Sequence, residues 1–176
     1  MDDRKRFGHY LCEKAVRPMF PELKRKKQQL SEEECIGLLK TQKRGMLAVN
    51  GADGHPYAVP MNHWYCEEDG KIYFHGAKFG HKIDAMRADG KVCFTVLDEG
   101  TPDPENWWLI FRSVVVFGRI EWVEDYDKMI AVSRALCGKF PADEAYIENE
   151  IRKSGPGTLC FAIVPEQICG KRVTER

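Results

Sequence analysis

Short apolar runs separated by tight turn signals constrain the fold of this chain more than any other feature of its sequence. The triplets Ala52-Asp53-Gly54 and Glu68-Asp69-Gly70 separate neighbouring runs and are rich in residues that favour turns. Such short connections suit antiparallel strands, because parallel strands need a crossover of about a dozen residues or more. We therefore predict strands at 45–50, 55–66, 71–75, 91–98, 107–123 and 158–164.

Helical patterns occur before, within and after this series of strands. Ser31, followed three residues later by Glu34, matches a capping box and predicts a helix start. The predicted helices are 31–43, 80–89, 125–139 and 143–152. Strands and helices do not alternate regularly and no Gly-rich dinucleotide-binding loop occurs, which argues against a doubly wound sheet. The predicted fold class is mainly β, an antiparallel barrel of about six strands with peripheral helices.

Prolines restrict the pairing or the length of two predicted strands, because proline has no N–H to donate to a neighbouring strand. Pro60 lies within 55–66, where it predicts a bulge, a bend or an edge position. Pro165 follows 158–164 and is expected to begin a short C-terminal tail. The long apolar run at 107–123 predicts one strongly bent strand.

Composition and charge exclude several classes of function. The chain has 176 residues and a formal net charge of +0, whereas a general nucleic-acid binder carries a basic excess. No apolar stretch approaches the roughly 20 residues that cross a bilayer, and no apolar segment follows the basic N-terminus as in a secretory signal. The seven cysteines lack CxxC spacing and predict buried thiols in a reducing cytoplasm. We predict a basic lead-in at 1–30 and one domain at 31–176, without a nucleic-acid or membrane partner.

The stretch 75–82 joins the end of a predicted strand to the start of a predicted helix. Lys78, His81 and Lys82 bring positive charge to this helix start. Cations there oppose the helix dipole, whereas a bound anion would reverse the effect and would accept hydrogen bonds from the free amides. The stretch is therefore a candidate phosphate site, and a solvated basic loop is the alternative. No Ser or Thr follows the lysine, so it is not a nucleotide-hydrolysing P-loop.

Arg112 lies in the predicted strand 107–123 on the same face as Val114 and Val116. A guanidinium among apolar neighbours needs a partner, because an unpaired buried charge is very costly. The partner is either a carboxylate of the protein or the phosphate of a ligand, whose oxygen pairs suit arginine. Ser113 projects to the opposite face and can donate a hydroxyl hydrogen bond.

The segment around Pro60 also carries the polar pair Asn62 and His63. Backbone groups freed at a proline kink could pair with the edge of a flat heteroaromatic ring, and a purely structural histidine is the alternative. The histidines of the chain lack metal-ligand spacing, so we predict no metal site. A serine hydrolase is also disfavoured, because no GxSxG elbow is present.

Five sequence blocks occur in one order: G-M-L-A-V at 45–49, H-P-Y-A-V-P-M-N at 55–62, K-I-Y-F-H-G-A-K-F-G-H-K at 71–82, K-V-C-F-T-V at 91–96 and F-R-S-V-V-V-F-G at 111–118. In this order they resemble the flavin-binding proteins related to pyridoxamine 5'-phosphate oxidase, and especially the branch named for nitroimidazole resistance. The resemblance spans about residues 30–171. It implies a split β-barrel that forms a homodimer and binds FMN, with FAD as an alternative, in two clefts at the subunit interface.

The matching blocks also imply roles for particular residues. Along the isoalloxazine ring the resemblance places Val59, Pro60, Met61 and Asn62. Around the ribityl phosphate it places His75, Gly76, Lys78, His81 and Lys82. It also places Arg112 and Ser113 at the flavin and does not specify which of the two subunits provides them. In the nitroimidazole branch the histidine that ends this strand is associated with the substrate side, so His75 is also the catalytic candidate, as a residue that exchanges a proton.

The C-terminus departs from the vitamin-oxidising members of this family. Their R-L-x-P signature is missing from residues 170–176, which argues against oxidation of pyridoxamine phosphate. We therefore predict an FMN-dependent oxidoreductase that takes electrons from NAD(P)H or another reductant and passes them to a small acceptor such as a nitroaromatic compound. A flavin-binding storage or sensor protein without robust catalysis is the alternative, and a barrel that binds haem or a deazaflavin is a third hypothesis.

Overall fold

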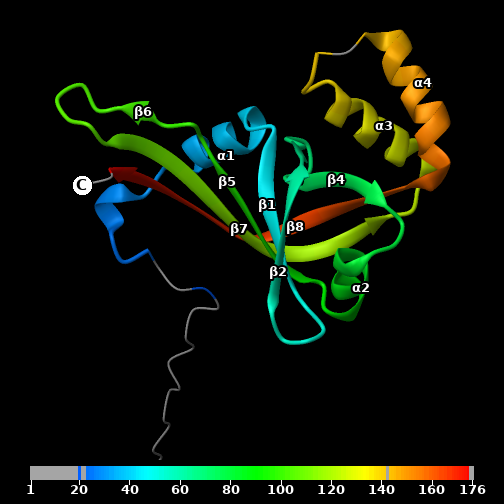
Figure 1. The fold of residues 1–176 in the computed structure, drawn as a ribbon, viewed down its shortest axis with the longest axis horizontal. Coiled ribbons are helices and arrows are strands. Elements are labelled where there is room, and N and C mark those ends of the chain that lie inside the picture. The colour runs from blue at the N-terminus through cyan, green and yellow to red at the C-terminus, as the bar shows by residue number, and fades with distance from the viewer. Residues whose placement is uncertain (1–19, 21–22, 142, 175–176) are drawn as a thin grey trace, which may run out of the picture.

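The computed structural model describes residue 20 and residues 23–141 and 143–174 (Figure 1). Most of the predicted basic lead-in at 1–30 therefore lies outside the described residues. The part of it that is described ends in a short 3-10 turn, Lys26–Gln28, and in Leu30, whose amide donates to the Gly170 carbonyl oxygen at 3.0 Å.

One curled antiparallel sheet of eight strands forms the body of the described chain (Figure 1). Its strands are β1 (Arg44–Asn50), β2 (Pro56–Asn62), β3 (Trp64–Tyr65), β4 (Ile72–Ala77), β5 (Lys91–Leu97), β6 (Thr101–Pro102), β7 (Leu109–Val123) and β8 (Thr158–Thr174). Neighbours follow the order β2-β1-β5-β7-β8-β4-β3, and β6 pairs with β7. The predicted fold class is confirmed, and β6 is a short additional strand between the predicted strands 91–98 and 107–123.

The two ends of this sheet are joined by the chain itself. β2 is the first strand in the sheet order and β3 is the last, yet only His63 separates them in the sequence. The sheet therefore curls back on itself as a half-barrel. No ladder joins β2 to β4 among the described strands, and we call this open side between β2 and β4 the seam.

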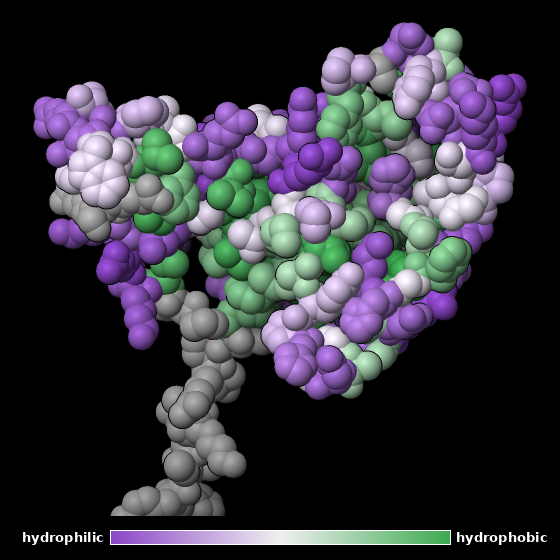
Figure 2. Space-filling model, viewed as in Figure 1, coloured by the Kyte–Doolittle hydropathy of each residue, from purple (hydrophilic) through white to green (hydrophobic). Residues whose placement is uncertain are grey.

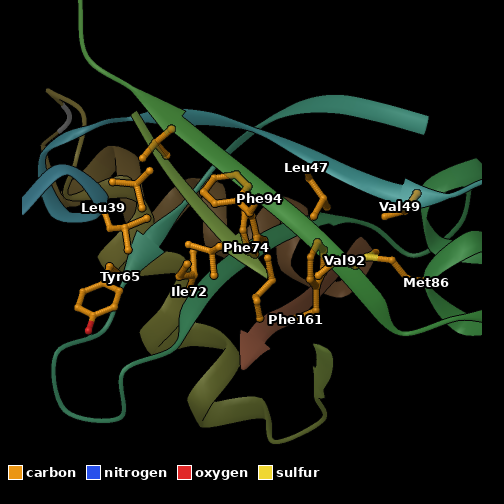
Figure 3. Packing of buried hydrophobic residues seen from close by; sticks show 14 of the residues in the cluster. Leu39, Leu47, Val49, Tyr65, Ile72, Phe74, Met86, Val92, Phe94 and Phe161 are labelled. Carbon is orange, nitrogen blue, oxygen red and sulfur yellow. The ribbon is translucent and has the colours of Figure 1, made fainter. Parts of the chain in front are cut away.

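Alternating side chains fill the inside of the curl. The inward residues Val114 and Val116 of β7 are completely buried. Phe74 stacks on Phe161 at a centroid distance of 5.1 Å and meets Phe94 edge-on at 5.0 Å (Figure 3). Interlocked aromatic rings of this kind add to the stabilisation that burial of their area provides. The core thus fixes β4, and with it the start of the segment that follows β4.

Four α-helices in the described chain surround the sheet: α1 (Glu32–Thr41), α2 (His81–Ala88), α3 (Tyr126–Cys137) and α4 (Glu144–Ser154). The predicted capping box of α1 is confirmed, since Ser31 Oγ accepts from the Glu34 amide at 3.2 Å and Glu34 Oε2 accepts from the Ser31 amide at 2.9 Å. α3 packs Val132 and Leu136 against β4 and β8, on the face of these strands opposite the main core (Figure 1).

The last strand is much longer than the sequence predicts. The expectation that a tail begins at Pro165 is wrong, because β8 stays paired with β7 as far as Thr174. Pro165 lies opposite Gly118 at a shift of register, and such a bulge accommodates the missing proline N–H. A Cβ on Gly118 would lie only 2.4 Å from the Val164 carbonyl oxygen, so the two strands approach closely here. The long partner strand therefore overrides the local proline signal.

The predicted strand 55–66 is divided at His63 into β2 and β3. Pro60 pairs with Met46 in regular register, and β2 lies at the edge of the described sheet. Of the predicted bulge, bend or edge position, the structure therefore shows the edge position. His63 is completely buried, and its Nε2 lies 2.9 Å from the Leu39 carbonyl oxygen. This favours the structural interpretation of that histidine. The strand predicted at 71–75 also extends further, because β4 runs on to Ala77.

The described cysteines agree with the sequence in being free and at least half-buried: Cys35, Cys66, Cys93, Cys137, Cys160 and Cys169. Burial raises the pKa of the Cys35 thiol to about 11. None of the helices in the described ranges has the length and apolar character needed to cross a membrane.

Candidate functional site

The ring of Tyr57 on β2 meets the ring of His81 at the start of α2. Their centroids are 4.5 Å apart and their planes are inclined by 69°, an edge-to-face contact. β2 carries the residues predicted to hold an aromatic ring, and the start of α2 carries residues predicted to hold a phosphate. The structure therefore brings these two parts of the predicted site together at the seam.

α2 starts directly after Gly80, whose φ of 118° lies in a region that favours glycine. No side chain within the described part of the protein caps this end of the helix. The Gly80 carbonyl oxygen accepts from the amides of Ile83 at 2.8 Å and Asp84 at 3.1 Å. The first amides of a helix have no partner within it, so those of His81 and Lys82 are available to an anion.

Lys82 folds back from α2 towards the end of β4. A Cβ built on Gly76 would lie 3.7 Å from Lys82 Cε and 3.9 Å from its Nζ, so the ammonium group lies beside the strand backbone. Lys78 Nζ donates to the Pro156 carbonyl oxygen at 2.6 Å, which ties this loop to the 3-10 turn Gly155–Gly157. Neither lysine forms an ion pair with a carboxylate among the described residues, so both ammonium groups keep their charge for a ligand. Asp84 in the first turn of α2 and Asp53, whose pKa is lowered mainly by a hydrogen bond from the His55 amide and in part by the charge of His81, offset part of the positive charge at this corner.

The predicted ring-binding residues alternate along β2. Val59 and Met61 are half-buried and pack against the main core, whereas Pro60 is exposed. Asn62 Oδ1 accepts a hydrogen bond from Arg44 Nε at 2.8 Å. Because β2 is an edge strand of the described sheet, its backbone groups on the seam side have no ladder partner there. They can pair with polar atoms at the edge of a flat ligand.

His75 lies on the opposite face of β4 from its neighbour Gly76. It lines a pocket of about 280 Å³ between β4 and the helices α3 and α4, together with Ser133 of α3 and Tyr146 of α4. We call this cavity the helix pocket. Burial lowers the pKa of the His75 imidazole, which favours the neutral ring. Within one chain, the strand itself separates His75 from the side of Gly76 on which Lys82 lies.

Arg112 and Ser113 lie near the other end of β7. His75, Cys160 and Val123 are neighbours on three adjacent strands, and Ser113 is ten residues before Val123 on β7. At about 3.3 Å per residue, this amounts to roughly 33 Å of strand. A single chain therefore does not unite these two residues with the basic corner.

Arg112 has a carboxylate partner within the chain. Its Nε donates to Asp98 Oδ2 at 2.8 Å, and its backbone amide donates to Asp98 Oδ1 at 2.8 Å. Burial acts to raise the pKa of Asp98, but the hydrogen bonds and charge of Arg112 hold that pKa below its usual value. The side chain is also half-exposed, because the buried part of this strand face begins only at Val114. The sequence allowed either a carboxylate of the protein or a ligand phosphate as the partner of Arg112, and the structure shows the carboxylate.

Two contributors to these sites were not singled out from the sequence. Tyr57 occurs in the block H-P-Y-A-V-P-M-N, but its contact with His81 depends on how the half-barrel curls. Asp98 follows β5, and its pairing with Arg112 depends on the register between β5 and β7. No local sequence pattern indicates either contact. The one available signal for the second contact is that Asp98 is an acidic residue at the end of the predicted strand 91–98.

The antiparallel half-barrel and its basic strand-to-helix corner define a protein of the split-barrel class. The sequence model of the pyridoxamine 5'-phosphate oxidase family matches residues 31–172, and the chain belongs to this family. Among curated proteins, 5a,11a-dehydrotetracycline/5a,11a-dehydrooxytetracycline reductase of Streptomyces rimosus is 35% identical over 85 residues, or 47% of this chain. The match spans 57% of the length of that reductase.

Solved structures share the fold. An FAD-binding protein of Mesorhizobium loti superposes with a TM-score of 0.62 at 26% identity, covering 83% of this chain and 97% of the other. A candidate 5-nitroimidazole antibiotic resistance protein of Bacteroides thetaiotaomicron gives a TM-score of 0.69 at 17% identity, covering 83% and 87%. The second similarity bears on the fold alone.

Proposed function

We propose that this protein is a flavin-dependent oxidoreductase that holds the phosphate of FMN at the corner between β4 and α2. The observation that carries the proposal is the Lys82 ammonium, which lies beside Gly76 at the start of a helix and forms no ion pair with any carboxylate of the described residues. Family membership supports it, as do the similarities to a reductase and to an FAD-binding protein.

The donors of this corner suit a phosphate dianion. Lys82, Lys78 and His81 supply positive charge, and the first amides of α2 point their N–H groups out of the helix. Charge-assisted hydrogen bonds of this kind are about twice as strong as neutral ones. Lys78 already donates to a backbone carbonyl, so Lys82 is the cation that we assign to direct phosphate contact.

The ring system of the flavin would lie against β2. Val59 and Met61 offer half-buried apolar surface, and the unpaired backbone edge of β2 offers donors and acceptors at the seam. A bound flavin supplies the redox chemistry, whereas the protein positions it and tunes its electronics. We propose NADH or NADPH as the electron donor, and the cytoplasm as the compartment, where free thiols stay reduced.

We further propose that the protein works as a homodimer. Pro60, Met46, Thr95, Val115 and Cys169 form a row across five adjacent strands on the outer face of the sheet. Met46 is 41% exposed and Leu97 of the same face is 53% exposed. Figure 2 shows hydrophobic side chains at the surface over the central strands. Exposed apolar surface of this kind favours a protein interface.

A second subunit would also bring together two parts of the predicted site that lie far apart within one chain. Arg112 and Ser113 lie far along β7 from the basic corner, so in this proposal they reach the flavin of the partner subunit. In this arrangement Arg112 either gives up part of its contact with Asp98 to bind the flavin, or keeps that contact and binds the flavin through the other N–H groups of its guanidinium.

His75 is the residue that we propose to exchange a proton with the electron acceptor. Burial favours its neutral imidazole, which can accept a proton on one nitrogen and donate one from the other. His75→Ala is then expected to retain bound flavin and to lose turnover. Unchanged turnover in this variant would refute the proton-exchange role of His75 and would leave the proposed flavin site unaffected.

The visible spectrum of the purified protein tests the proposed function directly. We expect flavin absorption, release of FMN rather than FAD on denaturation and chromatography, and bleaching by NADH or NADPH under anaerobic conditions. A bound flavin that no donor reduces would support the storage or sensor alternative. A colourless protein that binds neither FMN nor FAD on titration would refute the proposal.

A further inference from the structure

The helix pocket lies on the face of β4 that points away from the main core. α3 packs onto this face through Val132 and Leu136, and α4 is held to α3 by an ion pair between Arg134 Nη1 and Glu144 Oε1 at 2.7 Å. Figure 1 shows the two helices side by side above β4. Between them and the strand remains a cavity of about 280 Å³.

The walls of the helix pocket are apolar, with a few polar groups. Met129 and Ile130 of α3 line it together with Ile151 of α4, and His75 and Ser133 contribute polar atoms from different elements. Among the described residues, the partner of Ser133 Oγ is Cys160 Sγ at 3.9 Å, a long hydrogen bond to sulfur that leaves the hydroxyl with capacity to bind a ligand. Pockets for small molecules typically combine apolar walls with a few such convergent polar groups.

Aromatic side chains stand at the outer part of the cavity. Tyr126 is 67% exposed and Tyr146 is 57% exposed, yet both line the helix pocket. They therefore mark its mouth, where solvent and ligands enter. Tyrosine rings offer flat apolar faces to an aromatic ligand together with a polar hydroxyl.

The charge of the helix pocket differs from that of the seam. Glu150 is the only acidic or basic residue other than His75 among the described residues that line the pocket, and no lysine or arginine is among them. An anionic ligand would meet a carboxylate and no cation, whereas an uncharged ring meets apolar walls. In size, a dry cavity of about 150 Å³ is known to hold benzene, so 280 Å³ admits one or two rings.

We propose that the helix pocket binds an uncharged aromatic compound of one or two rings whose polar substituent reaches His75 and Ser133. The inference goes beyond the proposed function and does not rest on it, because β4 separates this pocket from the side of Gly76 on which Lys82 lies. Binding itself needs no flavin, so it can be tested alone.

The test uses the full-length protein as purified and two probes of equal ring size, 2-naphthol and 2-naphthoate. We expect 2-naphthol to bind with a Kd on the order of 100 μM, the scale of an unoptimised small ligand, and to shift the ring signals of His75 in NMR spectra. 2-Naphthoate should bind at least tenfold more weakly, because of Glu150. Equal affinity for the two probes, or no response at His75, would overturn the proposal.

Variants locate the bound probe. Tyr146→Ala at the mouth and Ile130→Trp in the wall should each weaken 2-naphthol binding at least fivefold. Tyr146 is mostly exposed, so its variant is expected to fold even if the larger tryptophan is not tolerated. Trp107→Ala is the control, because it removes an exposed aromatic ring outside the helix pocket. An equal loss in the control variant would show that the probe binds by non-specific contact and would refute the pocket.

A competition separates this inference from the proposed function. Saturating FMN should leave 2-naphthol binding intact, because Lys82, the cation assigned to the phosphate, lies on the other face of β4. Displacement by FMN would overturn the assignment to the helix pocket. Flavin content is measured independently by the visible spectrum, so a yellow protein that does not bind 2-naphthol refutes only this inference. A protein that binds 2-naphthol but no flavin refutes only the proposed function.

Discussion

The Tyr57 ring meets the His81 imidazole across the seam, with centroids 4.5 Å apart. Tyr57 belongs to β2, an edge of the sheet, and His81 begins α2, which follows β4. No backbone ladder joins β2 to β4 among the described strands, so side-chain contacts of this kind set the spacing between the two sides of the seam. In the proposed function, that spacing is the distance between the ring and the phosphate of one flavin.

Replacement of Lys82 tests the phosphate end of this arrangement. Lys82→Ala should weaken FMN binding by about 1.5–3 kcal/mol, or roughly 10- to 150-fold, because one charge-assisted hydrogen bond is lost. Riboflavin lacks the phosphate, so its affinity should change little. Fluorescence titration with both compounds measures the difference. Lys40→Ala is the control, since Lys40 pairs with Glu67 on the surface at 2.9 Å. Equal losses for FMN and riboflavin would contradict the phosphate contact.

The basic corner could be predicted from the sequence because its signals are local. A strand that ends near Gly76, a glycine at 80 and cations in the next two positions all lie within one short stretch. The capping box of Ser31 and Glu34 is local in the same way, and the structure confirms it. Features whose physical cause lies within four or five residues of each other are therefore readable without a structure.

Features that depend on strand pairing could not be predicted in this way. β8 continues past Pro165 only because β7 offers a partner and Gly118 leaves room for the bulge. The carboxylate that binds Arg112 is Asp98, which becomes its neighbour through the β5–β7 register. The alternating pattern correctly placed Arg112 on the strand face of Val114, but it did not show that the buried part of that face ends before Arg112.

The outer face of the sheet can be tested for dimer formation. Leu97→Asp puts a charge where the proposed interface excludes water, so we expect a monomer at micromolar concentration in analytical ultracentrifugation. FMN affinity should fall as well, because Arg112 of the partner would be withdrawn. Ala52→Asp introduces the same charge in the exposed turn after β1 and should leave the oligomeric state unchanged. A wild-type protein that sediments as a monomer would contradict the homodimer.

The buried His63 should make the fold sensitive to acid. Burial, followed by the charge of Lys139, lowers the pKa of this imidazole to about 4. The unfolded chain, with a pKa near 6.5, therefore binds a proton between these values that the folded chain does not bind. Stability is complete above about pH 6.5 and should fall by about 3 kcal/mol as the pH drops towards 4.

Urea denaturation between pH 4.5 and 7.5 measures this effect. His63→Gln keeps an N–H group for the Leu39 carbonyl oxygen but does not titrate, so its stability should depend much less on pH in this range. A variant that loses stability with acid as steeply as the wild type would assign the effect to other groups, of which His75 is the next candidate because burial also lowers its pKa.

The bulge opposite Pro165 should tolerate no side chain at Gly118. A Cβ there would lie 2.4 Å from the Val164 carbonyl oxygen and 2.7 Å from Ile163 Cγ2, so Gly118→Ala must push β7 and β8 apart. We expect a loss of about 1–3 kcal/mol in the free energy of unfolding, measured by urea denaturation. Gly37→Ala is the matched control, because its added Cβ in α1 would have no atom of the described residues within 4 Å. That change should instead stabilise the protein by up to about 1 kcal/mol, since alanine favours the helix. Equal effects at both positions would show that the close approach of β7 and β8 is not maintained in solution.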